Sequence, residues 1–134
     1  MNSTALAAFA PRMLSVLRIV TGLLLLQHGT MKMLSFPAGQ MAGMGFDPSS
    51  LAGWSGIFEL VGGVLILLGL FTRPAAFVMA GFMAVAYWTA HAPQGFYPIN
   101  NQGELAVLYC FVFLYLMCAG AGPWSLDAIL RKRV

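Results

Sequence analysis

Four long apolar runs, separated by segments that contain glycine, proline and polar residues, divide this chain. Each run has about the 20 residues that a helix needs to cross the hydrocarbon core of a bilayer. An isolated strand cannot satisfy its backbone hydrogen bonds in lipid, whereas a helix can. The pattern therefore predicts an all-α, integral membrane four-helix bundle that forms a single domain over residues 1–134, with helices at 13–35, 51–71, 74–91 and 103–120.

Residues that cap or break helices fall between these runs. Pro37 and the glycines after it end the first helix, and Ser49 or Ser50 is placed to cap the second. Thr72 is placed to cap the third helix, with Pro74 in its first turn. So short a connection predicts that the second and third helices are antiparallel neighbours.

The end of the chain predicts one further helix. The segment Gly120-Ala121-Gly122-Pro123 breaks the fourth helix, and Ser125 is then placed to cap a short amphipathic C-terminal helix along the membrane surface.

Composition agrees with a membrane location. Hydrophobic residues make up 60% of the chain and charged residues 8%, and the mean hydropathy is +0.82, which is too apolar for a soluble domain of this size. Because Arg18 interrupts the first run and no cleavage site follows it, we expect this run to stay as a membrane anchor.

The distribution of basic residues predicts the orientation. The loops 36–50 and 92–102 carry no Lys or Arg, whereas the two ends of the chain and the second connection carry five, namely Arg12, Arg73, Arg131, Lys132 and Arg133. The positive-inside rule therefore places both termini in the cytoplasm. The basic C-terminus is expected to touch anionic headgroups, so no nucleic-acid partner is needed to explain it.

Ionisable residues within the apolar runs are the candidate functional residues. The first run carries a helical stripe of polar and small residues that includes Arg18, His28 and Lys32, and the second run carries Glu59 near its middle. Charge is costly inside a bilayer and usually serves a partner or a function. With alternating helix directions, we expect a ligand-binding or proton-handling site in the outer half of the bundle, whereas Arg18 is an inner charge partner that can snorkel to the cytoplasmic surface. The predicted site residues are Lys32, Glu59, His28, His91 and Glu104.

Other interpretations of these residues stay open. Glu59 can simply neutralise Lys32 or His28 and fix the helix register. The pair His28 and His91 has the arrangement that bis-histidine haem ligation requires, but two histidines are a weak signal. Methionines near His28 suit Cu(I), yet methionine is an ordinary filler of apolar helices, so no metal site and no intrinsic cofactor are predicted.

Several short segments together resemble the DoxX family of small bacterial membrane proteins. They are Leu17-Arg18-Ile19, His28-Gly29 with Lys32, Glu59-Leu60 with Gly62-Gly63, Leu68-Gly69-Leu70-Phe71-Thr72-Arg73, and Gly120-Ala121-Gly122-Pro123-Trp124-Ser125-Leu126-Asp127. The resemblance covers nearly the whole chain and implies four helices in the bacterial inner membrane. It also implies a link to quinone and redox chemistry, because the family takes its name from a subunit of a thiosulfate:quinone oxidoreductase.

Three functions follow as hypotheses. The first is a redox- or stress-associated membrane subunit that binds a quinone-like molecule and works with a separate redox enzyme. The second is a small transporter or channel component for a weak acid or sulfur anion, which would need a homo-oligomer to form a pathway. The third is a structural subunit whose buried charges only fix helix packing. Since the sequence shows no nucleotide loop, zinc motif or nucleophile triad, a stand-alone enzyme is not expected.

Overall fold

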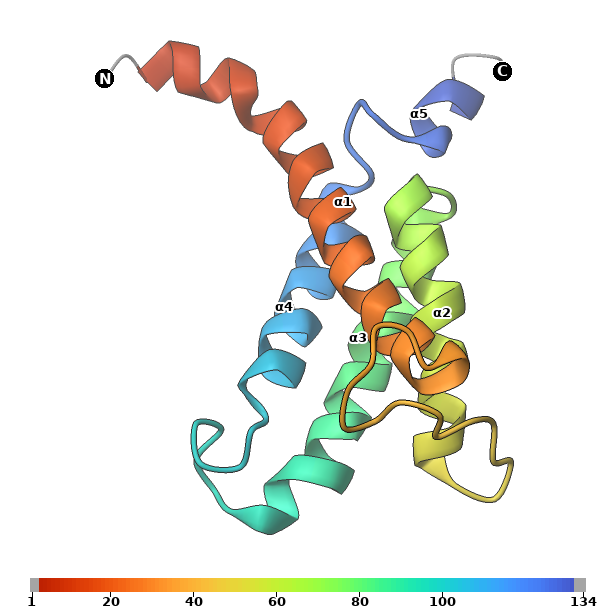
Figure 1. The fold of residues 1–134 in the computed structure, drawn as a ribbon. Helices are drawn as coiled ribbons and strands as arrows, with labels where there is room; N and C mark the ends of the chain where they lie inside the picture. Colours follow the sequence, from red (N-terminus) through yellow and green to blue (C-terminus); the bar gives the residue numbers. More distant parts are fainter. Residues whose placement is uncertain (1–2, 132–134) are drawn as a thin grey trace. The chain divides into compact units, whose positions relative to one another are not determined.

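The computed structural model describes residues 3–131, and every regular element in this range is helical (Figure 1). The predicted all-α class is therefore confirmed for the described chain. The elements are α1 (Ser3–Leu34), α2 (Leu51–Leu68), α3 (Thr72–Ala86), the π-helical turn η1 (Tyr87–His91), the 3₁₀ turn η2 (Ala92–Gln94), α4 (Glu104–Ala119) and α5 (Leu126–Arg131).

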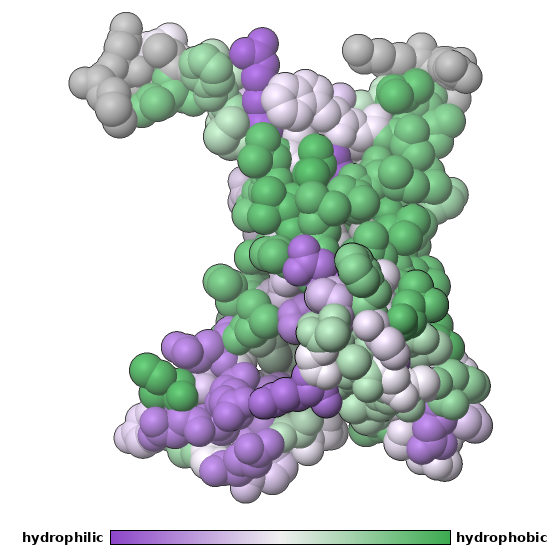
Figure 2. Space-filling view, in the orientation of Figure 1, coloured by the Kyte–Doolittle hydropathy of each residue, from purple (hydrophilic) through white to green (hydrophobic). Residues whose placement is uncertain are grey.

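Within residues 3–131, three helical segments are long and apolar enough to cross a membrane, namely Leu6–Leu34, Leu51–Leu68 and Thr72–Gln94. Hydrophobic side chains cover much of the visible surface along α1 and α2 (Figure 2). The fourth apolar helix, α4, has 16 residues and so is about 24 Å long, shorter than the roughly 30 Å of a bilayer core. The four-span bundle and the orientation of its termini stay predictions.

The chain divides into two compact units. The first consists of residues 3–72 and 121–131, and the second of residues 73–120. The first unit contains α1, α2 and α5, and the second contains α3 after its first residue, the turns η1 and η2, and α4.

Glycines bring α1 and α2 into close contact in the first unit. A Cβ atom at Gly22 would lie 2.6 Å from the backbone nitrogen of Leu67, and one at Gly29 would lie 2.6 Å from that of Leu60. From the other helix, a Cβ atom at Gly63 would lie 3.0 Å from the nitrogen of Leu26. Small residues let membrane helices approach until their backbones touch. This close packing sets the geometry of the buried polar residues between the two helices.

We expect Gly22→Ala to lower the free energy of unfolding by about 1–3 kcal/mol, because the new methyl group meets backbone rather than a movable side chain. Chemical denaturation in detergent micelles, followed by circular dichroism, measures this change. Gly81→Ala on α3 is the matched control, since a Cβ atom there has no neighbour within 4 Å; we expect it to be neutral or stabilising. Equal losses for the two variants would contradict the close packing at Gly22.

The caps of α2 explain where that helix begins and ends. Ser50 precedes the helix and its Oγ accepts the N–H of Gly53, so one of the two predicted capping serines is confirmed. At the other end Gly69 adopts φ +65°, and its N–H donates to the carbonyl of Ile66. The left-handed conformation of Gly69 ends the helix without the steric cost that a side chain would add.

The expected cap at Thr72 is wrong in detail. Thr72 is the first residue of α3, and the carboxylate of Asp127 accepts the N–H groups of Phe71 and Thr72, each at 2.9 Å. Burial opposes ionisation of Asp127, but these hydrogen bonds and the charge of Arg131 together hold its pKa below the ordinary value. The N-terminus of α3 is therefore capped by a residue near the C-terminal end of the chain.

The C-terminal helix begins as the sequence predicts. The Oγ of Ser125 accepts the N–H of Ala128, and α5 follows from Leu126 to Arg131. Lys132 and Arg133, which were expected to touch lipid headgroups, lie outside the described residues.

In the second unit, a buried asparagine orders the connection between η2 and α4. The side chain of Asn101 donates to the carbonyl of Gly95 at 2.8 Å and accepts the N–H of Gly103 at 2.8 Å. At the far end of α4, Arg73 donates to the carbonyls of Met117 and Cys118, which lie in the last turn of the helix. Cations are favourable at this negative end of the helix dipole.

Candidate functional site

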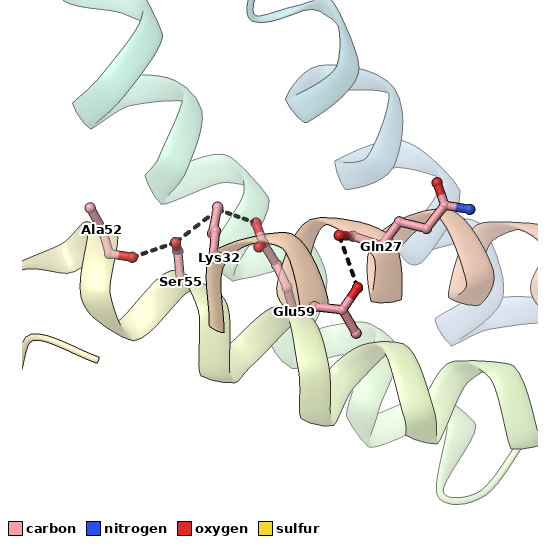
Figure 3. A network of polar contacts seen from close by, with 6 residues as sticks. Gln27, Lys32, Ala52, Ser55 and Glu59 are labelled. Carbon is pink, nitrogen blue, oxygen red and sulfur yellow. Dashed lines mark hydrogen bonds and ion pairs between the residues drawn. The ribbon is translucent and has the colours of Figure 1, made fainter. Parts of the chain in front are cut away.

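A buried ion pair joins α1 to α2. The Nζ of Lys32 lies 2.8 Å from the Oε1 of Glu59 and 2.9 Å from the Oγ of Ser55. Lys32 therefore bridges two acceptors on α2, and Ser55 in turn donates to the carbonyl of Ala52 (Figure 3). Lys32 and Glu59 are each 7% exposed. The expected approach of these two residues from neighbouring helices is thus observed.

Helical periodicity places both residues on the packed face. The buried residues of α1 recur every three or four positions and include Arg18, Thr21, Gly22, Leu25, Gly29 and Lys32. Glu59 lies on a matching face of α2 together with the buried glycines Gly53, Gly56, Gly62 and Gly63. The polar stripe that the sequence predicts therefore faces the interior of the first unit.

The ion pair leaves hydrogen-bonding capacity unused. The Oε2 of Glu59 is buried and has no hydrogen-bond partner among the described residues. An ammonium group carries three N–H donors, and the two contacts of Lys32 on Ser55 and Glu59 use two of them. Buried polar atoms are usually satisfied, so each exception requires an explanation. The site thus offers an acceptor and a donor side by side in an apolar surrounding.

The loop after α1 closes over the end of the helix that carries Lys32. The N–H of Gly43 donates to the carbonyl of Met31, and the N–H of Gly45 donates to that of Lys32 at 3.0 Å. Both glycines have positive φ, at +72° and +69°, a conformation that glycine adopts without strain. The glycine-rich loop therefore caps the last turn of α1 and holds the backbone of Lys32 in place.

Arg18 lies in the interior of the first unit, where its expected role as an inner charge partner stays a prediction but the expected reach to the surface is wrong. Its side chain is 0% exposed, so it does not snorkel to a surface. Instead of a carboxylate it bonds to carbonyls: its Nε lies 2.8 Å from the oxygen of Ala121, and its Nη1 lies 2.6 Å from that of Ile66. Further hydrogen bonds reach the carbonyls of Leu67 and Trp124. Arg18 therefore ties α1 to the C-terminal end of α2 and to the segment before α5.

The remaining predicted residues have separate environments. His28 is half-buried on α1, one turn before Lys32. In the second unit the Nδ1 of His91 lies 3.0 Å from the carbonyl oxygen of Asn101, while Glu104 is exposed at the start of α4. Their predicted convergence with Lys32 and Glu59 stays a prediction. Residues 3–131 hold no group of three or more His, Cys, Asp or Glu side chains that could bind a metal ion.

These helices and buried charges define a small multi-pass α-helical membrane protein. The DoxX family model matches residues 13–92, and the model described as the TQO small subunit DoxD matches residues 54–134. Each match covers more than half of the chain, which therefore belongs to the DoxX family, and the second match relates it to a subunit of thiosulfate:quinone oxidoreductase.

Similar proteins occur in at least two bacterial species. An uncharacterised protein of Haemophilus influenzae is 46% identical over 133 residues, which cover 96% of this chain and 98% of the relative. An uncharacterised membrane protein of Mycobacterium tuberculosis is 31% identical over 144 residues, covering 96% of this chain and 87% of that protein. No solved structure gives a significant match.

Proposed function

We propose that this protein is a redox- or stress-associated membrane subunit that binds a quinone-like small molecule at the Lys32–Glu59 pair and works with a separate redox partner. The observation that carries this proposal is the buried, unpartnered Oε2 of Glu59 beside the ammonium group of Lys32. The match to a subunit family of a quinone-linked oxidoreductase supports it.

The two groups fit the two oxidation states of such a ligand. A hydroxyl of the reduced form donates to the Oε2 of Glu59, and a carbonyl of the oxidised form accepts the third N–H of Lys32. A carboxylate beside the hydroxyl is also a suitable proton acceptor when the ligand is oxidised. His28, which lies one turn before Lys32 on α1, is a second proton-handling group. The protein supplies binding and proton transfer, while the partner enzyme carries the electrons.

The proposed topology places this chemistry in the outer half of the bacterial inner membrane. Both termini are cytoplasmic, α4 completes a four-helix bundle, and His91 and Glu104 join Lys32 and Glu59 in one outward-facing layer. The absence of Lys and Arg from the loops 36–50 and 92–102 supports this orientation.

Glu59→Gln should weaken binding of a reduced, short-tailed ubiquinone analogue by about tenfold, or roughly 1.4 kcal/mol, because the amide no longer offers two charged acceptors. Isothermal titration calorimetry on protein in lipid nanodiscs measures the dissociation constant. Asp47→Asn is the matched control, since it removes the charge of an exposed carboxylate in the loop before α2. We expect the control to bind as the wild type does. Equal affinities for wild type and Glu59→Gln would refute the assignment.

Transport of a free anion is less well supported by the geometry. The positive charge of Lys32 is already matched by Glu59 at 2.8 Å, so it attracts a second anion only weakly. Measurement of anion flux into proteoliposomes distinguishes the two functions, because a quinone-binding subunit produces none.

A further inference from the structure

Helix α1 is longer than a membrane requires. Its 32 residues extend over about 48 Å, whereas the hydrocarbon core of a bilayer is about 30 Å thick. About 20 residues cross that core, so a span that ends at Lys32 begins near Arg12. The residues of α1 before Arg12 therefore lie beyond the hydrocarbon core.

This extra segment has an apolar, exposed surface. Leu6 is 49% exposed and Phe9 is 51% exposed, and the guanidinium of Arg12 lies 5.6 Å from the centre of the Phe9 ring. Pro11 lies inside the helix, where a proline removes a backbone hydrogen bond and bends the axis. The first turns of α1 bend away from the rest of the helix (Figure 1).

The C-terminal segment is held at the same end of the first unit. The N–H of Trp124 donates to the Oγ of Ser15, and the N–H of Asp127 donates to the carbonyl of Gly69 at 2.9 Å. Arg18 also bonds to the carbonyl of Trp124. The main chain of Trp124 is thus fixed to α1, and the main chain of Asp127 in α5 is fixed to the end of α2.

The exposed side chains of this segment are again large and apolar. Trp124, just before α5, is 54% exposed, and Ile129 and Leu130 within α5 are 48% and 50% exposed. Arg131 is exposed at the end of α5, and the sequence continues with Lys132 and Arg133. The carboxylate of Asp127, the acidic residue of this helix, already accepts the N–H groups of Phe71 and Thr72.

We infer that the first turns of α1, together with Trp124 and α5, form an interfacial platform that binds an anionic lipid leaflet. Apolar side chains beside Lys and Arg are typical of segments that lie in the interface, where tryptophan is also enriched. Basic residues next to a span are attracted to anionic headgroups. A lipid surface is the occupant that fits, because the platform continues directly from a membrane-spanning helix and its net charge is positive.

Fluorescence of Trp124 in the full-length protein tests the inference. In a Trp54→Phe, Trp88→Phe background, Trp124 is the only tryptophan. Nanodiscs are prepared from phosphatidylcholine alone or with phosphatidylglycerol, both brominated near the glycerol end of the acyl chains. We expect brominated lipid to quench Trp124, and to quench it more strongly in the anionic discs. A variant in which Arg12, Arg131, Lys132 and Arg133 are all replaced by Gln should lose that difference between the two compositions, as should the wild type at high salt.

Two results would overturn the platform. In the first, aqueous iodide quenches the fluorescence of Trp124 fully and brominated lipid does not quench it. A docking site for a soluble protein would give the same result. The second is equal quenching in the two lipid compositions at low salt. Neither result depends on ligand binding at Glu59, so the inference stands or fails apart from the proposed function.

Discussion

Replacing Arg18 with methionine should lower the free energy of unfolding by about 3 kcal/mol or more. The guanidinium is 0% exposed and donates to four carbonyls, those of Ile66, Leu67, Ala121 and Trp124. Hydrogen bonds from a charged group contribute about 1.5–3 kcal/mol each, and the carbonyls left without a donor are costly when buried. The loss should be largest in the contacts of α5, because two of these carbonyls lie just before that helix. Chemical denaturation in micelles, monitored by circular dichroism, measures the change.

Two further variants make this expectation specific to Arg18. Arg12→Met removes an exposed arginine from the same helix, and should change stability by no more than about 0.5 kcal/mol. Arg18→Lys keeps the charge, but a lysine cannot donate to carbonyls on both α2 and the 121–124 segment. The free energy of unfolding of this variant should therefore stay well below that of the wild type. If lysine restored wild-type stability, charge rather than the guanidinium geometry would hold the three segments together.

Most helix bounds could be predicted because they depend on local pattern, but the prediction for the first helix was wrong at its start: α1 begins at Ser3, ten residues before the predicted residue 13. The length of each apolar run, Ser50 before α2 and Ser125 before α5 all act within a few residues of the element that they define. The buried stripe of α1 could be predicted for the same reason, since residues three and four apart share one helix face.

The roles of Arg18 and Asp127 could not be predicted, because they depend on contacts across the chain. Arg18 reaches residues 48 to 106 positions away, and Asp127 caps backbone groups more than 50 positions away. Sequence spacing carries no information about such partners. In Arg18 the only available signal is a strong charge in an apolar run, which indicates a buried partner but not that the partner is a set of carbonyls.

The candidate site was predictable in part. The opposite charges of Lys32 and Glu59, at similar depth on antiparallel helices, identified the pair. Ser55 was missed, because a serine one turn before Glu59 is an ordinary residue in a membrane helix. Its contact with Lys32 depends on the side-chain conformation of the lysine. The same applies to the unpartnered Oε2 of Glu59, which is a property of the packed geometry rather than of the residue type.

Lys32→Met should destabilise the protein by about 3–5 kcal/mol, because it leaves the carboxylate of Glu59 buried without its cation. The double variant Lys32→Met with Glu59→Leu should instead lie within about 1 kcal/mol of the wild type, since apolar pairs often replace a buried ion pair without loss. Denaturation of both variants measures these differences. Gln27→Met, which alters an exposed residue of α1, controls for the introduction of methionine into this helix.

The double variant also separates a structural role of the pair from a ligand-binding role. If Lys32 and Glu59 only fix the contact between α1 and α2, the stable double variant should bind the reduced ubiquinone analogue as tightly as the wild type. If they form the binding site, the double variant should fold normally and lose binding by at least the tenfold expected for Glu59→Gln, because both the donor and the acceptor are gone. A double variant as unstable as Lys32→Met would instead show that the ion pair has a stabilising role that apolar packing cannot replace. Stability and affinity must therefore be measured on the same preparation. The stability shows whether a loss of binding is caused by misfolding, and the affinity shows whether a correctly folded variant still has its binding site.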